Sequence, residues 1–184
     1  MERITFGATG TMTGNTLEGV AHVYGTRAAQ GSGYVEFAPG SFKQALKKAD
    51  VRAFVNHNTD LILGRTTSGT VRLSDEADGL HYAIDLPETS YAADLRAVVA
   101  RGDVTEMSFG ILPGAMKMMR ADDGRQVQLH TSVKELFDIS PTSLPAFGGT
   151  SAQLHSTWSV HPGETAQSQA VRARHRAHRK ETNQ

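Results

Sequence analysis

Ser108 is the first residue of this sequence whose type and surroundings suggest chemistry. It occurs in the stretch "GDVTEMSFG", between the apolar residues Met107 and Phe109. The stretch is not the G-x-S-x-G elbow of the α/β-hydrolases, because Glu106 stands where the first glycine would be. A serine hydroxyl becomes an effective nucleophile only when a base removes its proton. Taken alone, the stretch therefore favours an ordinary strand serine, and a nucleophile needs support from the rest of the chain.

His57 is the histidine whose neighbours best suit proton transfer. It follows the apolar run "VRAFV" and stands between Asn56 and Asn58, where a strand is expected to end. The end of a strand can hold a side chain rigidly and still leave it accessible. A lone histidine in such a place is nevertheless more often structural than catalytic. His22 and His81 fall inside alternating strand patterns, and we interpret them as ordinary half-exposed residues.

No motif points to a metal or an organic cofactor. The eight histidines, at positions 22, 57, 81, 130, 155, 161, 175 and 178, form no H-E-x-x-H or comparable ligand pair. The chain has no cysteine, which excludes a disulfide, a thiol nucleophile and a Cys-based zinc site. It also lacks a phosphate-binding P-loop and a dinucleotide fingerprint. We therefore expect catalysis, if any, to use side chains alone.

Composition indicates one compact folded domain with residues left over for a tail. The chain has 184 residues, of which 39% are hydrophobic, and its formal net charge is zero. No apolar run approaches the length that crosses a bilayer, so we expect no membrane association. The beginning, "MERITFGATG", carries charge where a signal peptide needs apolar residues. An intracellular protein is the simplest expectation.

The positive charge is concentrated near the C-terminus. The segment 171–180, "VRARHRAHRK", holds five Arg or Lys residues and two histidines, which leaves the rest of the chain mildly acidic. From about Gly148 onward Ser, Thr, Gln, Gly and Ala replace the periodic patterns. We expect a folded domain over 1–148 and a flexible tail over 149–184. Such a tail is usually solvated; electrostatic contact with nucleic acid or an acidic protein is the alternative.

The hydrophobic pattern predicts many short strands and two helices. Strands are expected at 17–24, 51–55, 69–73, 80–86, 104–112 and 133–140, with a hairpin over 115–130 that turns at Asp123-Gly124. One helix is predicted from Ser41, its cap, to about Ala49, and a second, with Thr89 or Ser90 as its cap, ends at Gly102. The glycine-rich stretch 25–37 is expected to be a mobile loop.

These elements indicate a β-rich α+β domain of seven or eight strands. The strands follow one another too closely for a regular βαβ succession. A closed or strongly bent antiparallel β-barrel, with about two to several surrounding helices, is therefore favoured over a doubly wound sheet.

Five sequence blocks, in this order and at compatible spacings, resemble a known family. The blocks are "FAPGSF", "VNHN", "LGRTTSGTVRLSDEADGL", "DLRAVVARGDVTEMSFGI" and "LFDISPTSLPAF". Each block alone is weak, but the ordered set is similar to the head maturation (prohead) serine proteases of tailed bacteriophages over residues 17–147. That family is related in fold to the herpesvirus assembly proteases, which have a β-barrel with surrounding helices. The resemblance thus implies the same architecture as the strand pattern.

The resemblance also assigns roles to three residues. The block "VNHN" supplies the family's histidine, His57, and the block "MSFG" supplies its nucleophile, Ser108. The acidic position falls on Asp138, where many relatives have glutamate. Glu135 is the fallback, although simple strand alternation places it on the opposite face from Asp138.

The oxyanion hole stays open at this point. Main-chain N–H groups beside Ser108 or in the Gly31–Gly33 loop are candidates, and so are Arg65 and Arg101. In related herpesvirus enzymes an arginine contributes, but no block of this sequence matches it. One such donor is worth on the order of 3 kcal/mol.

The function implied by the resemblance is a serine endopeptidase of phage capsid assembly. It would act inside the prohead in the host cytoplasm, cleave the scaffold or the scaffold-like part of the major capsid protein, and then cleave itself. The family also suggests that self-association switches the enzyme on. Two alternatives remain: a catalytically silent scaffold or shell component on the same fold, and nucleic-acid binding through the basic tail.

Overall fold

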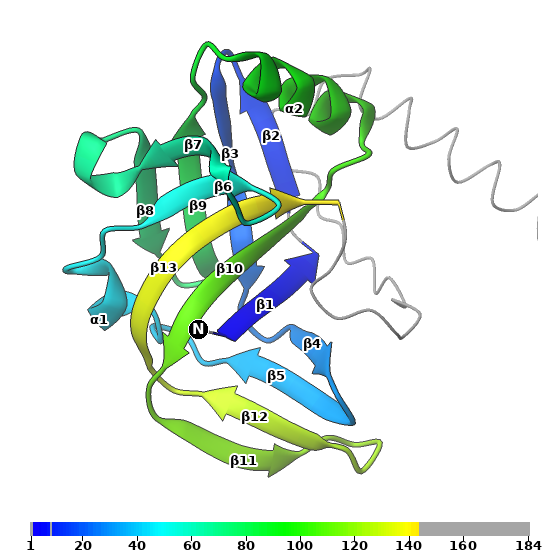
Figure 1. Ribbon diagram of the computed structural model, residues 1–184. Helices are drawn as coiled ribbons and strands as arrows, with labels where there is room; N and C mark the ends of the chain where they lie inside the picture. Colours follow the sequence, from blue (N-terminus) through cyan, green and yellow to red (C-terminus); the bar gives the residue numbers. More distant parts are fainter. Residues whose placement is uncertain (1, 8, 144–184) are drawn as a thin grey trace, which may run out of the picture. The chain divides into compact units, whose positions relative to one another are not determined.

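The computed structural model describes residues 2–7 and 9–143 of the chain (Figure 1). Its strands are β1 (Glu2–Gly7), β2 (Thr9–Thr13), β3 (Thr16–Val23), β4 (Arg27–Gln30), β5 (Gly33–Phe37), β6 (Arg52–Val55), β7 (Asn58–Arg65), β8 (Val71–Asp75), β9 (Gly79–Asp85), β10 (Glu106–Pro113), β11 (Met116–Arg120), β12 (Gln126–His130) and β13 (Val133–Thr142). The helices are α1 (Lys43–Leu46) and α2 (Ser90–Arg101), with a 3-10 turn η1 (Thr66–Ser68). None of these helices is long and apolar enough to span a membrane. The predicted tail over 149–184 lies outside the described residues.

The strands form three sheets, so the β-rich prediction is confirmed. The five-stranded sheet has the order β1-β10-β13-β6-β7, and the other two have the orders β11-β12-β5-β4 and β2-β3-β9-β8. Most neighbours are antiparallel, but β13 pairs with β6, and β12 with β5, in parallel. The predicted antiparallel pairing therefore holds for most neighbouring strands and is wrong for these two pairs. Within the described strands no sheet closes on itself, and the predicted closed barrel is not confirmed.

Strands β10 and β13, which are neighbours in the five-stranded sheet, are long and curved (Figure 1). The pairing of β10 with β13 shifts register between Gly110 and Ile111, which leaves Phe137 unpaired. A second shift follows between Leu112 and Pro113. Each such bulge bends a strand and increases its twist.

The core contains an aromatic cluster to which all three sheets contribute. Phe37 ends β5, Phe109 lies in β10, and Phe42 precedes α1; their ring centroids are 5.1–5.6 Å apart. His22 of β3 joins them, with its ring 5.2 Å from that of Phe37 and no solvent exposure. The prediction of a half-exposed His22 is wrong because β3 shifts register between Val20 and His22, which turns the imidazole inward. Burial lowers the pKa of His22 to about 3.

The second predicted helix is confirmed as α2, but Thr89 at its N-terminus makes no side-chain capping hydrogen bond. Its C-terminus has the two hydrogen bonds of a Schellman motif, from Gly102 N–H to the Val99 carbonyl and from Asp103 N–H to the Val98 carbonyl. Gly102 takes the left-handed φ of 82° that this motif requires. Gly102 was enough to predict where this helix ends, because a glycine has no Cβ and adopts that φ at little energetic cost.

The first predicted helix is much shorter than expected. It covers only Lys43–Leu46, and no side chain caps its N-terminus, so the predicted cap at Ser41 is wrong. The chain leaves the helix because Thr66 holds the next residues in another conformation. Its Oγ1 donates to the Ala49 carbonyl and accepts from the Val51 N–H. A tertiary contact therefore overrides the local helical pattern.

The glycine-rich stretch predicted as a mobile loop contains β4 and β5. The two strands are joined by a turn in which Gly31 has a φ of 55°. Gly33 lies so close to β12 that an added Cβ would meet the Gln126 carbonyl oxygen at 2.6 Å. The glycines thus serve a tight turn and a close strand contact. β1 and β2 were also not predicted.

Candidate active site

His57 lies in the two-residue turn between β6 and β7. Val55 and Asn58 pair across the hairpin, and Asn56 and His57 form its tip. Both tip residues have positive φ, 50° for Asn56 and 57° for His57. Such values at both central positions belong to the type I′ turn, which matches the twist of the flanking strands. The predicted strand end at this histidine is therefore confirmed, and the turn projects the imidazole from a fixed backbone.

Asn56 attaches this turn to the end of β13. Its N–H donates to the Pro141 carbonyl oxygen at 3.0 Å, and its side-chain Oδ1 accepts from the Ser143 N–H at 3.1 Å. Asparagine tolerates a left-handed conformation better than most residues. The β6–β7 turn is thus bound to the strand that carries Asp138.

Ser108 lies within β10 and is 1% exposed. It pairs with Ser140 of β13 on one side and with Thr5 of β1 on the other. The flanking residues Met107 and Phe109 are 2% and 0% exposed and belong to the core. The serine is therefore held by core packing on the opposite face of its own strand.

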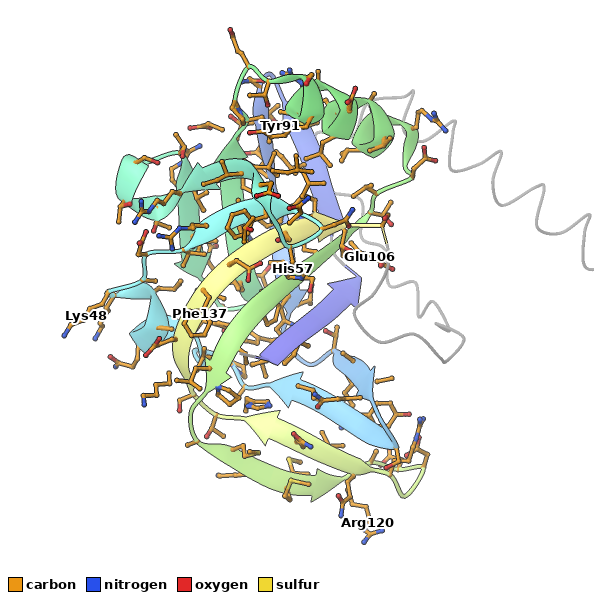
Figure 2. The ribbon with its side chains drawn as sticks, viewed as in Figure 1. Lys48, His57, Tyr91, Glu106, Arg120 and Phe137 are labelled. Atoms are coloured by element: carbon orange, nitrogen blue, oxygen red, sulfur yellow. The ribbon has the colours of Figure 1, made fainter. Side chains whose placement is uncertain are left out.

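The structure brings together all three residues that the sequence resemblance singled out. His57 Nε2 lies 2.6 Å from Ser108 Oγ, and His57 Nδ1 lies 2.5 Å from Asp138 Oδ2. The side chains of His57 and Asp138 are 9% and 6% exposed. Figure 2 labels His57 where β10 and β13, which carry the other two residues, run side by side. One imidazole thus links a hydroxyl and a carboxylate in a largely buried setting.

A fourth residue, Ser140, belongs to this hydrogen-bonded group and was missed in the sequence. Its hydroxyl donates to Asp138 Oδ2 at 3.0 Å, and its side chain is fully buried. The signal was present in the spacing. Residues two apart in a strand share a face, so the side chains of Asp138 and Ser140 are expected to project from the same face of β13.

Glu135, the alternative to Asp138, does not contact His57. Its side chain is exposed, and it pairs with Leu112 further along β13. The unpaired Phe137 interrupts the simple alternation on which its predicted facing depended. Within the described residues, Asp138 is the carboxylate at the histidine.

The hydroxyl of Ser108 has two acceptors for its single proton. One is His57 Nε2 at 2.6 Å, and the other is the main-chain carbonyl oxygen of Ile4 at 3.2 Å. When His57 is neutral with its proton on Nδ1, the hydroxyl donates to Nε2. When His57 is protonated, Nε2–H donates to Oγ, and the hydroxyl proton turns to Ile4. The hydroxyl is therefore hydrogen-bonded in both protonation states of the histidine.

The two arginines considered for an oxyanion hole are engaged elsewhere. Arg65 Nη2 lies 2.5 Å from Asp50 Oδ2, and Arg101 Nη2 lies 2.8 Å from Asp103 Oδ2. The Gly31–Gly33 turn joins β4 and β5 in the sheet β11-β12-β5-β4, whereas Ser108 lies in the five-stranded sheet. The main-chain N–H groups beside Ser108 serve the sheet as well, because Met107, Ser108 and Phe109 pair with β1 on one side and with β13 on the other.

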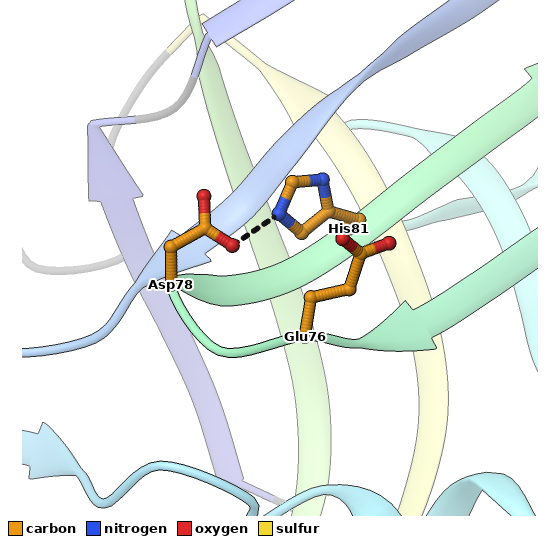
Figure 3. Close-up of side chains that lie close together, drawn as sticks. All are labelled: Glu76, Asp78 and His81. Carbon is orange, nitrogen blue, oxygen red and sulfur yellow. Dashed lines mark hydrogen bonds and ion pairs between the residues drawn. The ribbon is translucent and has the colours of Figure 1, made fainter.

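A separate cluster of possible metal ligands lies at the turn between β8 and β9. Ligand atoms of Glu76, Asp78 and His81 lie within 4.8 Å of one another, and His81 Nε2 is 2.8 Å from Asp78 Oδ1 (Figure 3). Both carboxylates are exposed. Exposed acidic groups commonly cluster without a metal, and no further feature here points to an ion. We assign the cluster no role.

A comparison with known protein families finds a match that covers most of the chain. A protein-family model described as caudovirus prohead serine protease matches residues 4–164 of the 184. The matched region includes Ser108, His57, Asp138 and Ser140. No curated protein and no solved structure matches the chain.

Proposed function

Because the chain belongs to the family of caudovirus prohead serine proteases, we propose that Ser108, His57 and Asp138 are its nucleophile, its general base and the group that orients the base. Family membership itself makes the chain a serine protease of phage capsid maturation. The residue roles are supported by one observation above all. The His57 ring lies 2.6 Å from the Ser108 hydroxyl and 2.5 Å from the Asp138 carboxylate.

The arrangement suits a single tautomer of the imidazole. The Asp138 carboxylate accepts a hydrogen bond from Nδ1–H of His57, which leaves the lone pair of Nε2 facing Ser108. Oγ attacks the scissile carbonyl carbon while its proton passes to Nε2. The resulting imidazolium is stabilised by the adjacent carboxylate, and Ser140 supplies one further donor to that carboxylate.

The proton then completes the acyl transfer. His57 Nε2–H gives it to the leaving amine, and the acyl group stays on Ser108 as an ester. A water molecule enters, Nε2 removes its proton, and the hydroxide attacks the ester carbonyl. The carboxylic acid product leaves, and Oγ recovers its proton from Nε2. Histidine suits both transfers because it exchanges a proton near neutral pH.

The substrates that we propose are proteins of the assembling capsid. The chain would cleave the scaffold, or the scaffold-like part of the major capsid protein, inside the prohead in the host cytoplasm, and would then cleave itself. Residues 149–184, outside the described part of the chain, would direct it into the shell. Self-association as an activating step is part of the same proposal. A catalytically silent capsid component is the competing hypothesis.

Active-site labelling separates the two hypotheses. We expect a fluorophosphonate probe to label the wild-type chain, and wild-type chain to process co-expressed capsid protein. Ser108→Ala should abolish both, and His57→Ala should reduce both strongly. Ser74→Ala, which removes a hydroxyl from β8, should change neither. Processing that continues unchanged in Ser108→Ala would exclude Ser108 as the nucleophile, and a wild-type chain that neither labels nor cleaves would support the silent component.

A further inference from the structure

Glu106 lies on the same face of β10 as Ser108. The pairings of β10 with β1 and with β13 run without a register shift from Glu106 to Gly110. Strand alternation therefore holds over this segment, and residues two apart project to the same side. The spacing between such residues is about 7 Å. Figure 2 labels Glu106 where β10 begins and His57 beside the same part of the strand.

The carboxylate of Glu106 has no cationic partner in the described part of the chain. Asp50, Asp85 and Asp103 each form an ion pair with an arginine. Glu106 makes neither an ion pair nor a side-chain hydrogen bond with any described residue, although it is half-buried. Burial alone raises its pKa. A partly desolvated carboxylate without a partner is unfavourable, and a cation supplied from outside would relieve that cost.

Apolar residues lie beside Glu106 where β10 begins. A small hollow there has room for only about 10 Å³, and its walls Met107 and Pro141 lie on the core face of β10, opposite Ser108. A basic side chain would therefore reach Glu106 from the face that carries Ser108. The stem of a lysine or arginine would lie along the surface of the sheet there, with its charged end at the carboxylate.

We propose that Glu106 determines substrate specificity by binding a lysine or arginine side chain close to the scissile bond. This inference rests on the proposed role of Ser108 as the nucleophile. An extended peptide has side chains at the same spacing as a strand, so a carboxylate about 7 Å from the nucleophile lies within reach of a residue beside the cleaved bond. The proteolytic sites in the capsid substrate would then contain a basic residue at one fixed position.

Internally quenched peptides test the proposal directly. One parent peptide, taken from the processed region of the co-expressed capsid protein, is varied to Lys, Arg, Gln or Glu at each position around the cut. For the full-length wild-type chain we expect Lys or Arg at one position to exceed Gln in kcat/KM by about tenfold, the size of a partly buried charge pair. Glu106→Gln should remove that preference, and Glu106→Lys should favour Glu at the same position.

Two comparisons make the result unambiguous. Glu135→Gln removes an exposed carboxylate from neighbouring β13 and should keep the wild-type preference. Cleavage of the Gln peptide should be similar in wild type and Glu106→Gln, which shows that the near-isosteric variant is folded and active. A wild-type chain without basic preference, or a preference that survives in both Glu106 variants, overturns the inference alone. Cleavage that persists in Ser108→Ala overturns the proposed function instead.

Discussion

Ser140 donates a hydrogen bond of 3.0 Å to the same oxygen of Asp138 that contacts His57. Both side chains are buried, so the bond is shielded from water. Hydrogen bonds to charged groups contribute about 1.5–3 kcal/mol. We expect Ser140→Ala to lower kcat/KM for a peptide at least about tenfold with little change in KM. Ser140→Thr keeps the hydroxyl and should recover most of the loss; equal activity of all three chains would contradict the role.

Asp138 and Glu135 can be distinguished by a pair of isosteric substitutions. In the proposed mechanism Asp138→Asn removes the charge that fixes the tautomer of His57, and a change of this kind lowers kcat by about 10⁴ in a serine protease triad. We expect a loss of about 10³–10⁴ here. Glu135→Gln should leave kcat near the wild-type value because the side chain is exposed and does not contact His57. Single-turnover acylation measures both, and the opposite order of effects would make Glu135 the third member.

The turn that carries His57 gives a prediction about stability. Asn56→Ala keeps a Cβ at a φ of 50° and loses the hydrogen bond to Ser143. Together these effects should lower the free energy of unfolding by about 2 kcal/mol. Asn56→Gly loses only the hydrogen bond and gains freedom at positive φ, so its cost should be smaller. Urea unfolding compares them, and a glycine variant less stable than the alanine variant would contradict the argument.

His22 predicts how stability depends on pH. Burial holds the pKa of the folded-state imidazole at about 3, against an ordinary value of 6.5. Between these values the unfolded chain binds a proton that the folded chain does not. Stability should therefore fall as pH drops below about 6.5, by up to roughly 1.4 kcal/mol per pH unit, until about pH 3.

Substitution of His22 isolates this effect. His22→Leu removes the titrating group and should flatten the curve of unfolding free energy between pH 6.5 and 4, whatever its absolute stability. Asp50 and Asp85, with pKa values lowered to about 2 by their arginine partners, act in a lower pH range. His81→Gln, on the partly exposed histidine of β9, should keep the wild-type slope. An unchanged slope in His22→Leu would locate the acid sensitivity elsewhere.

The proposed targeting role of the basic C-terminal segment can be tested by deleting that segment. Deleting residues 165–184 should lower incorporation of the chain into proheads and leave peptide cleavage unchanged, if the segment binds an acidic scaffold. Quantifying the chain in purified proheads measures the first effect. Unchanged incorporation would remove the targeting role, and salt-sensitive DNA binding lost with the segment would favour nucleic acid as the partner.

Local patterns predicted those parts of the fold that local interactions determine. Gly102 ends α2, and the hairpin of β11 and β12 turns at Asp123-Gly124, as the sequence predicted. Where a contact between residues distant in the sequence determines the conformation, the local sequence pattern predicted it wrongly. Thr66 shortened the first helix, and a register shift buried His22.

In the candidate site, too, some features follow from the local sequence and others depend on contacts between distant residues. The positions of Ser108 and His57 at a strand and a strand end follow from their neighbours in the chain. Their meeting does not, because it depends on the sheet order that places β13 between β10 and β6. Ser140 was missed although it stands two residues after Asp138 in a predicted strand, a spacing that places both side chains on one face.

Ser108 lies in a strand whose two edges are both occupied. β1 pairs with β10 on one side and β13 pairs with it on the other, and both pairings include Ser108. A peptide therefore cannot add to β10 as a further strand and use main-chain hydrogen bonds to align itself with the serine. It would have to lie across the face of the sheet that carries Ser108. Recognition on such a route depends on side chains rather than on backbone pairing.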